Sequence, residues 1–150
     1  MDVLRKIRLP FIYYEVGVMY VVATALIKWL AGDSWFVLIY ILGAIIGFHL
    51  LDAVEHWVQI QPSPYRTLLF QAVFGVVSIF VLTSSSGLLG KGVVLALGLR
   101  ILIGQIVEVK EQKRFTTWFP NVQTDPAVHK RVLVGLTIFF LAQTLIFFLV

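Results

Sequence analysis

The chain has 150 residues, of which 59% are hydrophobic and only 13% are charged, and its mean hydropathy is +0.93. Soluble domains carry about 25% charged residues, so this composition excludes a chain that faces water over most of its surface. Cysteine is absent, which excludes disulfides, thiolate catalysis and cysteine-ligated metal centres. The net charge of +4 does not indicate nucleic-acid binding, because the basic residues lie in short segments between apolar ones.

Five apolar segments follow one another along the chain, each near the ~20 residues that a membrane-spanning helix needs. They cover about residues 10–30, 35–57, 67–85, 88–107 and 132–150. Turn-forming residues separate the first four: Gly32-Asp33-Ser34, in which Ser34 can cap the next helix, then Pro62-Ser63-Pro64, then the Thr-Ser-Gly run at 83–87. The sequence therefore predicts an all-α fold, an integral membrane bundle of about five transmembrane helices that forms a single domain over residues 1–150.

The first segment also resembles a signal peptide, because basic residues precede an apolar run and an Ala-Thr-Ala site lies at 23–25. Two features favour a retained helix instead. Glu15 interrupts the apolar run, and the hydrophobic stretch continues past the site to Leu30.

Charge between the segments predicts the orientation of the bundle. With five spans, the N-terminus and the loops at 58–66 and 108–131 share one side and hold nine basic residues, against Lys28 and Lys91 on the other. The positive-inside rule then places the N-terminus in the cytoplasm and the C-terminus on the opposite side. The 108–131 loop also carries Phe115, Trp118 and Phe119, which leaves open a solvated loop or contact with lipid headgroups or a partner.

Polar side chains cluster near the predicted cytoplasmic end of the second segment: His49, Asp52, Glu55, His56 and Gln59. At about 100° per residue they fall within an arc of about 120°. An ionisable group at the centre of a span costs roughly 2.5–3.5 kcal/mol, so these groups should face protein or water. Solvation of the last helical turn explains Glu55, His56 and Gln59 equally well, whereas we expect His49 and Asp52 to belong to a buried site.

Other segments bring polar groups to a similar depth. Arg100 lies about 12 Å inside the end of the fourth span, at 1.5 Å of rise per residue. The groups that we expect at this level are Arg100, Gly104, Glu108 and Glu111 on one helix face with Gln105 at its edge, Glu15 on the first helix, Gln71 on the third and Gln143 on the fifth. Two of these groups, Asp52 and Arg100, could have a purely structural role as an ion pair.

Charge balance raises the question of what else the site holds. Four carboxylates, Glu15, Asp52, Glu55 and Glu108, face one guanidinium, so three negative charges remain if all are ionised. In a low-dielectric layer, protons, a bound cation or water must offset that surplus.

A metal site is a further alternative. Asp52 and His56 are spaced i and i+4 and can chelate one ion from a single helix, with Glu15 or Glu108 completing the ligands. The competing interpretation, which we prefer, is that His49 and His56 only hydrogen-bond within the bundle. No cofactor is indicated and no catalytic residue is identified, because the chain lacks paired Glu-x-x-His motifs, a Ser-His-Asp order, a Gly-rich phosphate loop and a zincin motif.

The opposite face of the second segment carries Gly43-x-x-x-Gly47. Small residues at this spacing let two helices approach closely. With glycines on one side and ionisable groups on the other, we expect this helix to lie at the centre of the bundle.

These patterns favour a small carrier or binding protein with a polar site near the cytoplasmic leaflet, which accepts a proton, a cation, or a cationic or lipid headgroup. His49, Asp52, Arg100 and Glu108 would form the site, with Glu15 and His56 in support. One alternative is a non-catalytic subunit or assembly factor of a membrane complex. Another is a membrane-embedded lipid-modifying enzyme, metal-assisted, although the sequence favours a protein that is not an enzyme. The expected partner is the lipid bilayer, and a partner membrane protein or self-association stays open.

Overall fold

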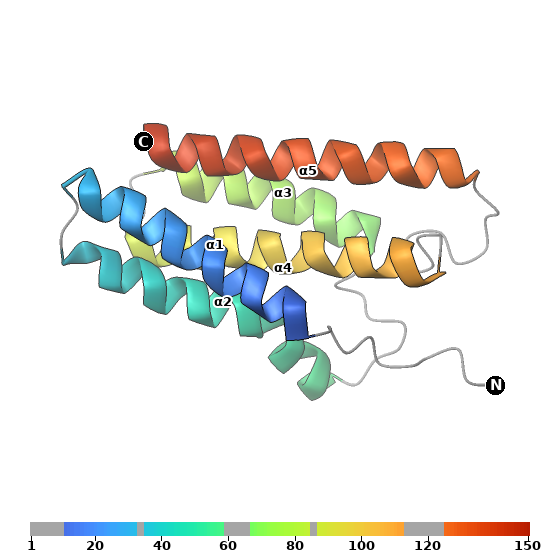
Figure 1. Ribbon diagram of the computed structural model, residues 1–150, viewed down its shortest axis with the longest axis horizontal. Coiled ribbons are helices and arrows are strands. Elements are labelled where there is room, and N and C mark those ends of the chain that lie inside the picture. Colours follow the sequence, from blue (N-terminus) through green and yellow to red (C-terminus); the bar gives the residue numbers. More distant parts are fainter. Residues whose placement is uncertain (1–10, 33–34, 59–66, 85–86, 113–124) are drawn as a thin grey trace.

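The computed structural model describes residues 11–32, 35–58, 67–84, 87–112 and 125–150. This part of the chain forms five helices and no strand: α1 (Phe11–Leu30), α2 (Phe36–Val58), α3 (Leu68–Thr83), α4 (Leu88–Gln112) and α5 (Pro126–Leu149) (Figure 1). The predicted all-helical bundle is confirmed for these residues. The expected Ser34 cap, the Pro62-Ser63-Pro64 turn and the aromatic residues of the 108–131 loop lie outside them.

Two helices extend beyond the apolar segments that predicted them. Helix α4 continues to Gln112, and α5 already begins at Pro126. Asp125 caps α5, because its side chain accepts a hydrogen bond of 2.9 Å from the amide of Ala127. Proline suits the first position of a helix, since that position has no hydrogen-bond partner for an N–H group. Polar residues such as Lys110 and Lys130 are good helix formers, so helix formation continues where hydrophobicity ends.

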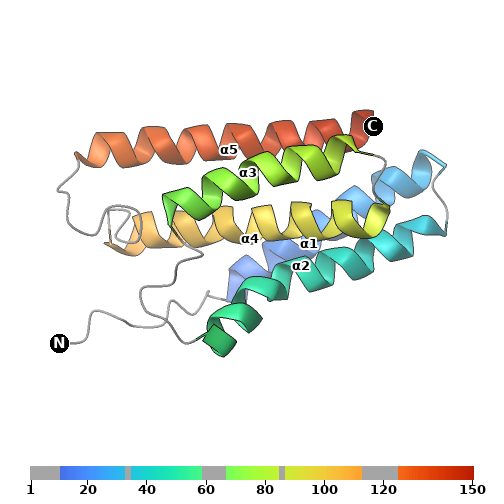
Figure 2. The ribbon, with the colours of Figure 1, turned by 180° about the vertical axis from the view of Figure 1, so that it is seen from behind.

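The helices alternate in direction. α1, α3 and α5 run one way and α2 and α4 run the other (Figures 1 and 2). One end of the bundle therefore collects the first turns of α1, α3 and α5 and the last turns of α2 and α4. We call it the charged end, because Glu15, Asp52, Arg100, Glu108 and Lys110 lie toward it. Lys28 and Lys91 lie toward the opposite end.

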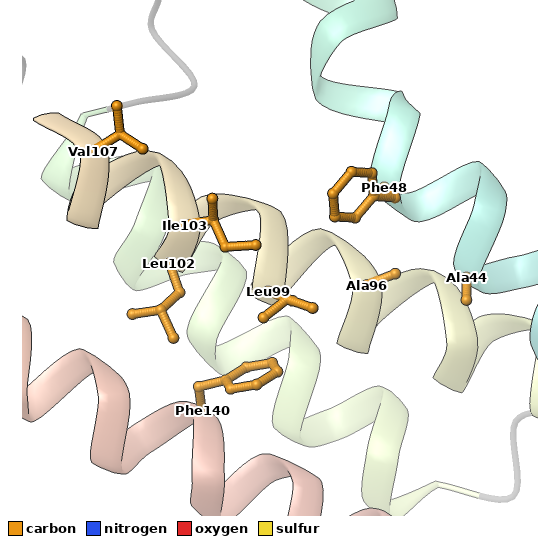
Figure 3. Packing of buried hydrophobic residues seen from close by; sticks show 8 residues of the cluster. All are labelled: Ala44, Phe48, Ala96, Leu99, Leu102, Ile103, Val107 and Phe140. Atoms are coloured by element: carbon orange, nitrogen blue, oxygen red, sulfur yellow. The ribbon is translucent and has the colours of Figure 1, made fainter. Parts of the chain in front are cut away.

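Helix α4 is the centre of the bundle. In its apolar stretch 78% of the residues are buried, compared with 39% in α2 and 17% in α5. The main core cluster consists of Ala44 and Phe48 from α2, Phe140 from α5, and Ala96, Leu99, Leu102, Ile103 and Val107 from α4 (Figure 3). The prediction that α2 lies at the centre was therefore wrong. Helix α2 packs mainly against α4, whereas α4 is also covered by α3 and α5.

Glycines bring α2 and α4 into backbone contact. A Cβ atom added to Gly43 would overlap the carbonyl oxygen of Leu89, and one added to Gly47 would overlap that of Val93. From the other side, a Cβ on Gly92 would overlap the carbonyl oxygen of Tyr40. The close approach predicted from Gly43-x-x-x-Gly47 is confirmed, and its partner is α4 of the same chain. We call this contact the glycine seam.

Within the described residues, three helices, α2, α4 and α5, are long and apolar enough to cross a membrane, and α3 is apolar but has only 16 residues. Large apolar side chains also cover the outside of the bundle. Met19 of α1, Val76 of α3 and Leu141 of α5 each keep 60% or more of their surface exposed. This pattern suits a lipid-facing exterior, because soluble monomers rarely expose apolar patches of this extent.

Candidate functional site

Arg100 of α4 and Asp52 of α2 form an ion pair at the charged end. The Nη2 atom of Arg100 lies 2.6 Å from the Oδ1 atom of Asp52, the distance of a charge-assisted hydrogen bond. The exposed fraction is 4% for the Arg100 side chain and 41% for that of Asp52. The predicted pair is present, but the predicted burial of Asp52 is wrong: only the guanidinium is enclosed, and the carboxylate reaches it from the edge of the bundle.

The glycine seam explains why these two residues meet. It places Gly43 against Leu89 and Gly47 against Val93, so residues of α2 and α4 pair in parallel along both helices. Asp52 and Arg100 follow further along the same two helices and continue this pairing. The position of the ion pair thus follows from the glycine seam, which lies earlier along both helices.

A small cavity of about 10 Å³ lies beside the ion pair, with Gln71, Arg100, Gln105 and Glu108 as its polar lining. All four side chains are buried, and Glu108 is only 1% exposed. Within the part of the chain that the structure describes, the Nε atom of Arg100 and the Oε1 atom of Gln105 have no hydrogen-bond partner. A buried donor or acceptor without a partner is costly, so a donor and an acceptor at one cavity indicate a site for a small polar molecule.

A second cavity of about 40 Å³ lies deeper between α3, α4 and α5. It shares Gln71 and Ile101 with the first cavity, and Gln143 lies on its far side. Gln143 is 2% exposed and donates a hydrogen bond from Nε2 to the hydroxyl of Ser78, which in turn donates to the carbonyl oxygen of Gly75 over 2.8 Å. Buried amide groups therefore continue inward from Arg100 toward the middle of the bundle.

Three of the predicted site residues do not join this cluster. His49 and His56 of α2 and Glu15 of α1 are exposed. At about 100° per residue, His49 and His56 lie about 140° and 120° around α2 from Ala44, the residue that faces α4, whereas Asp52 lies about 80° away. The arc of polar residues was identified correctly, but only one edge of it reaches the neighbouring helix.

The metal alternative gains no ligands from the structure. Among the described residues, no group of three or more His, Asp or Glu side chains comes together to hold an ion. The Asp52–His56 pair therefore has no third ligand within that part of the chain. The side chain of Glu111 and all of Gln59 lie outside the described residues.

Aromatic residues pack together toward the opposite end of the bundle. Tyr40 stacks on Phe147 with ring centroids 5.0 Å apart, and its hydroxyl shares a 2.7 Å hydrogen bond with Thr24. Tyr20 shares a 2.8 Å hydrogen bond with Thr144. A larger groove of about 530 Å³ between α1 and α2 is lined by apolar side chains, including Trp29 and Trp35.

Sequence reasoning missed Ser78 and Gly92. Ser78 is a single serine in an apolar helix and gives no signal until its partner Gln143 is known. Gly92-x-x-x-Ala96 repeats the small-residue spacing of Gly43-x-x-x-Gly47 and could have identified α4 as the partner of α2.

The arrangement can hold a small polar species next to an ion pair that is partly open to the outside. It combines a buried guanidinium, a half-exposed carboxylate, a buried carboxyl group and amides that can donate and accept hydrogen bonds. No protein family, curated protein or solved structure matches this chain. The function is therefore inferred from the site.

Proposed function

We propose that this chain is a small polytopic membrane protein that carries protons, with its proton-accepting site at the Asp52–Arg100 pair near the cytoplasmic leaflet. The observation that carries the proposal is the pair itself: a half-exposed carboxylate held 2.6 Å from a buried guanidinium, beside a cavity lined by Glu108 and Gln105. Ionisable groups inside a membrane bundle are rare and commonly mark ion or proton paths.

Size and charge favour a proton over the other ligands that the sequence left open. A cavity of about 10 Å³ has room for about one water-sized particle, which is too small for a lipid headgroup. A metal cation at this position would lie next to the guanidinium of Arg100, and like charges repel strongly where the dielectric constant is low. A proton moves along hydrogen bonds and needs no larger space.

We further propose that all five helices cross the membrane with the charged end in the cytoplasm. The sequence supports the orientation, because nine basic residues belong to the N-terminus and the segments at 58–66 and 108–131, against Lys28 and Lys91 in the other segments. Helix α1, with 20 residues, is about 30 Å long and matches the hydrocarbon core. Helix α3, with 16 residues, is about 24 Å long, a mismatch that local thinning of the bilayer can accommodate.

Proton flux into vesicles tests the proposal. The purified protein is reconstituted into phosphatidylcholine vesicles that contain a pH-sensitive dye, and the internal pH is followed after an external pH step with potassium and valinomycin present. Wild-type vesicles should equilibrate faster than protein-free vesicles. Asp52→Asn should reduce the rate to that of protein-free vesicles, and Asp52→Glu should restore part of it.

Asp125→Asn is the matched control. It also removes one negative charge near the charged end, but Asp125 is an exposed cap of α5 and asparagine caps helices equally well. Its flux should equal that of the wild type. Equal fluxes in wild type, Asp52→Asn and protein-free vesicles would contradict the proposal and favour a structural ion pair, as in a non-catalytic subunit of a membrane complex.

A further inference from the structure

We infer that water enters the bundle at the charged end and reaches Ser78 through both cavities, so that a path with a closed inner end runs from the first cavity, between α2, α3 and α4, to the second, between α3, α4 and α5. This inference rests on the proposed proton site and extends it inward by naming the route, the residue that links the cavities and the point at which the route stops.

The first step is the cavity beside Arg100. Its volume of about 10 Å³ matches one water molecule. A buried water also needs two to four polar partners. Arg100 Nε is a donor and Gln105 Oε1 is an acceptor, and neither has a partner among the described residues. One water molecule bound to both would satisfy two otherwise costly groups, so we assign a water site to this cavity.

The second step is the passage past Gln71. This residue lies on α3, is 8% exposed and lines both cavities. An amide side chain can donate and accept hydrogen bonds at the same time, so it can bridge water molecules on its two sides. Among the described residues, the two cavities otherwise share only Ile101, which offers no polar side-chain atom. Gln71 is therefore the polar link.

The third step is the inner end of the path. The second cavity, of about 40 Å³, has Gln143 in its lining, and Gln143 bonds to Ser78. Beyond this pair, Tyr40, Leu82, Leu95 and Phe147 are each at most 1% exposed, and their side chains are apolar except for the Tyr40 hydroxyl. The path thus ends near the middle of the bundle and does not continue to the opposite end in this conformation.

Deuterium exchange of single thiols tests the path with the smallest available probe. The chain has no cysteine, so each introduced thiol is the only one, and infrared spectroscopy can follow its S–H stretch as it converts to S–D in heavy water. Ser78→Cys is nearly isosteric and places the thiol at the inner end. Val107→Cys is also nearly isosteric and places it in the apolar core cluster of α4, where Val107 is 1% exposed.

The Ser78→Cys thiol should exchange at least about tenfold faster than the Val107→Cys thiol, because exchange in a dry core requires a local opening of the structure. Equal rates would overturn the path. Gly98→Cys provides a second variant in case Ser78→Cys misfolds. Gly98 lines the second cavity, and a Cβ there meets Gln143, Phe140 and Phe74 at an ordinary 3.6 Å, so its thiol should also exchange fast.

The role of Gln71 is tested by adding Gln71→Leu to Ser78→Cys. Leucine cannot bridge water molecules, so exchange should slow to the rate of Val107→Cys. Unchanged fast exchange would overturn the assignment of Gln71 as the link. Failure of the water path and failure of the proton-carrier proposal can be told apart. If the chain does not carry protons, Asp52→Asn leaves the vesicle flux unaltered. The thiol exchange rates report only on water access and do not depend on transport.

Discussion

Helix α4 has two faces that are packed in opposite ways. Toward α2 it forms the glycine seam, where backbone atoms touch and Ala44 and Ala96 are at most 1% exposed. Toward α3 and α5 it meets Phe74, Phe140 and Gln143, and a cavity of about 40 Å³ remains between them. Small side chains let helices close completely, whereas large and irregular ones leave gaps unless their shapes match. One helix thereby combines a tightly fixed contact between small residues with a looser contact that leaves a cavity.

Enlarging a glycine of the seam should give the largest effect. Gly47→Leu should lower the free energy of unfolding by about 3 kcal/mol or more, at the upper end of overpacking effects, because the obstructing atom is a backbone oxygen that cannot rotate away. Unfolding by SDS in mixed micelles, followed by tryptophan fluorescence, measures it. Gly135→Leu on α5 is the control, since no atom of another described element lies within 4 Å of its added Cβ. Equal stability of both variants would mean that the seam is not a close contact.

Breaking the Asp52–Arg100 ion pair should give the second-largest loss of stability, and the loss should differ between the two single variants. Asp52→Asn removes the carboxylate that pairs with the buried Arg100 and should cost about 2–3 kcal/mol, below the 3–5 kcal/mol of fully buried pairs because Asp52 is half-exposed. Arg100→Gln leaves a carboxylate that can reach solvent and should cost less. The double variant should recover part of the loss in the same SDS titration. Strictly additive losses would show that the two residues are not coupled.

Removing one partner of the Ser78–Gln143 hydrogen bond tests the contact between α3 and α5. Ser78→Ala leaves the buried amide of Gln143 without its acceptor and should cost about 1–2 kcal/mol. Combining it with Gln143→Leu removes both polar groups and should be nearly neutral. Thermal unfolding followed by circular dichroism compares the three variants. A double variant that is less stable than Ser78→Ala would contradict the prediction.

The smallest effect is expected at the opposite end. Thr24→Val keeps the shape of the side chain but removes the hydroxyl that bonds Tyr40. Interhelical hydrogen bonds in membrane proteins contribute about 0.6 kcal/mol on average, and we expect a loss of this size by the same thermal measurement. Thr137→Val, whose hydroxyl bonds only the backbone of its own helix among the described residues, is the matched control. A loss equal to that of the Asp52 variant would show that this end also depends on polar contacts.

The sequence predicted the number and order of the helices well, and residues with a clear physical role bound several of them. Gly32 adopts a positive φ of 107° after α1, and Asp125 caps α5. The Asp52–Arg100 pair was also predictable, because both residues are costly in an apolar segment and lie at similar depths. The spacing of Gly43 and Gly47 correctly indicated a close helix contact.

The remainder of the site depends on how each helix is rotated, which the sequence does not determine. The polar arc of α2 includes His49, Asp52 and His56, and periodicity alone cannot say which edge of the arc faces a neighbour. The glycines decide it by turning α2 so that Asp52 reaches α4 while both histidines stay outside. In the same way, the pairing of Gln143 with Ser78 depends on contact between α3 and α5, and neither helix carries a motif for it.

The glycine seam also limits how the bundle can move. A shift of α2 along α4 by one residue, about 1.5 Å, would push backbone atoms together at Gly43 and Gly47 and draw Asp52 away from Arg100. We therefore expect α2 and α4 to behave as one rigid body. The larger cavity instead borders α3 and α5, which Ser78 and Gln143 join. Exposure of the inner end of the polar path to the opposite side of the membrane would then require α3 and α5 to tilt together against a stationary α2–α4 pair.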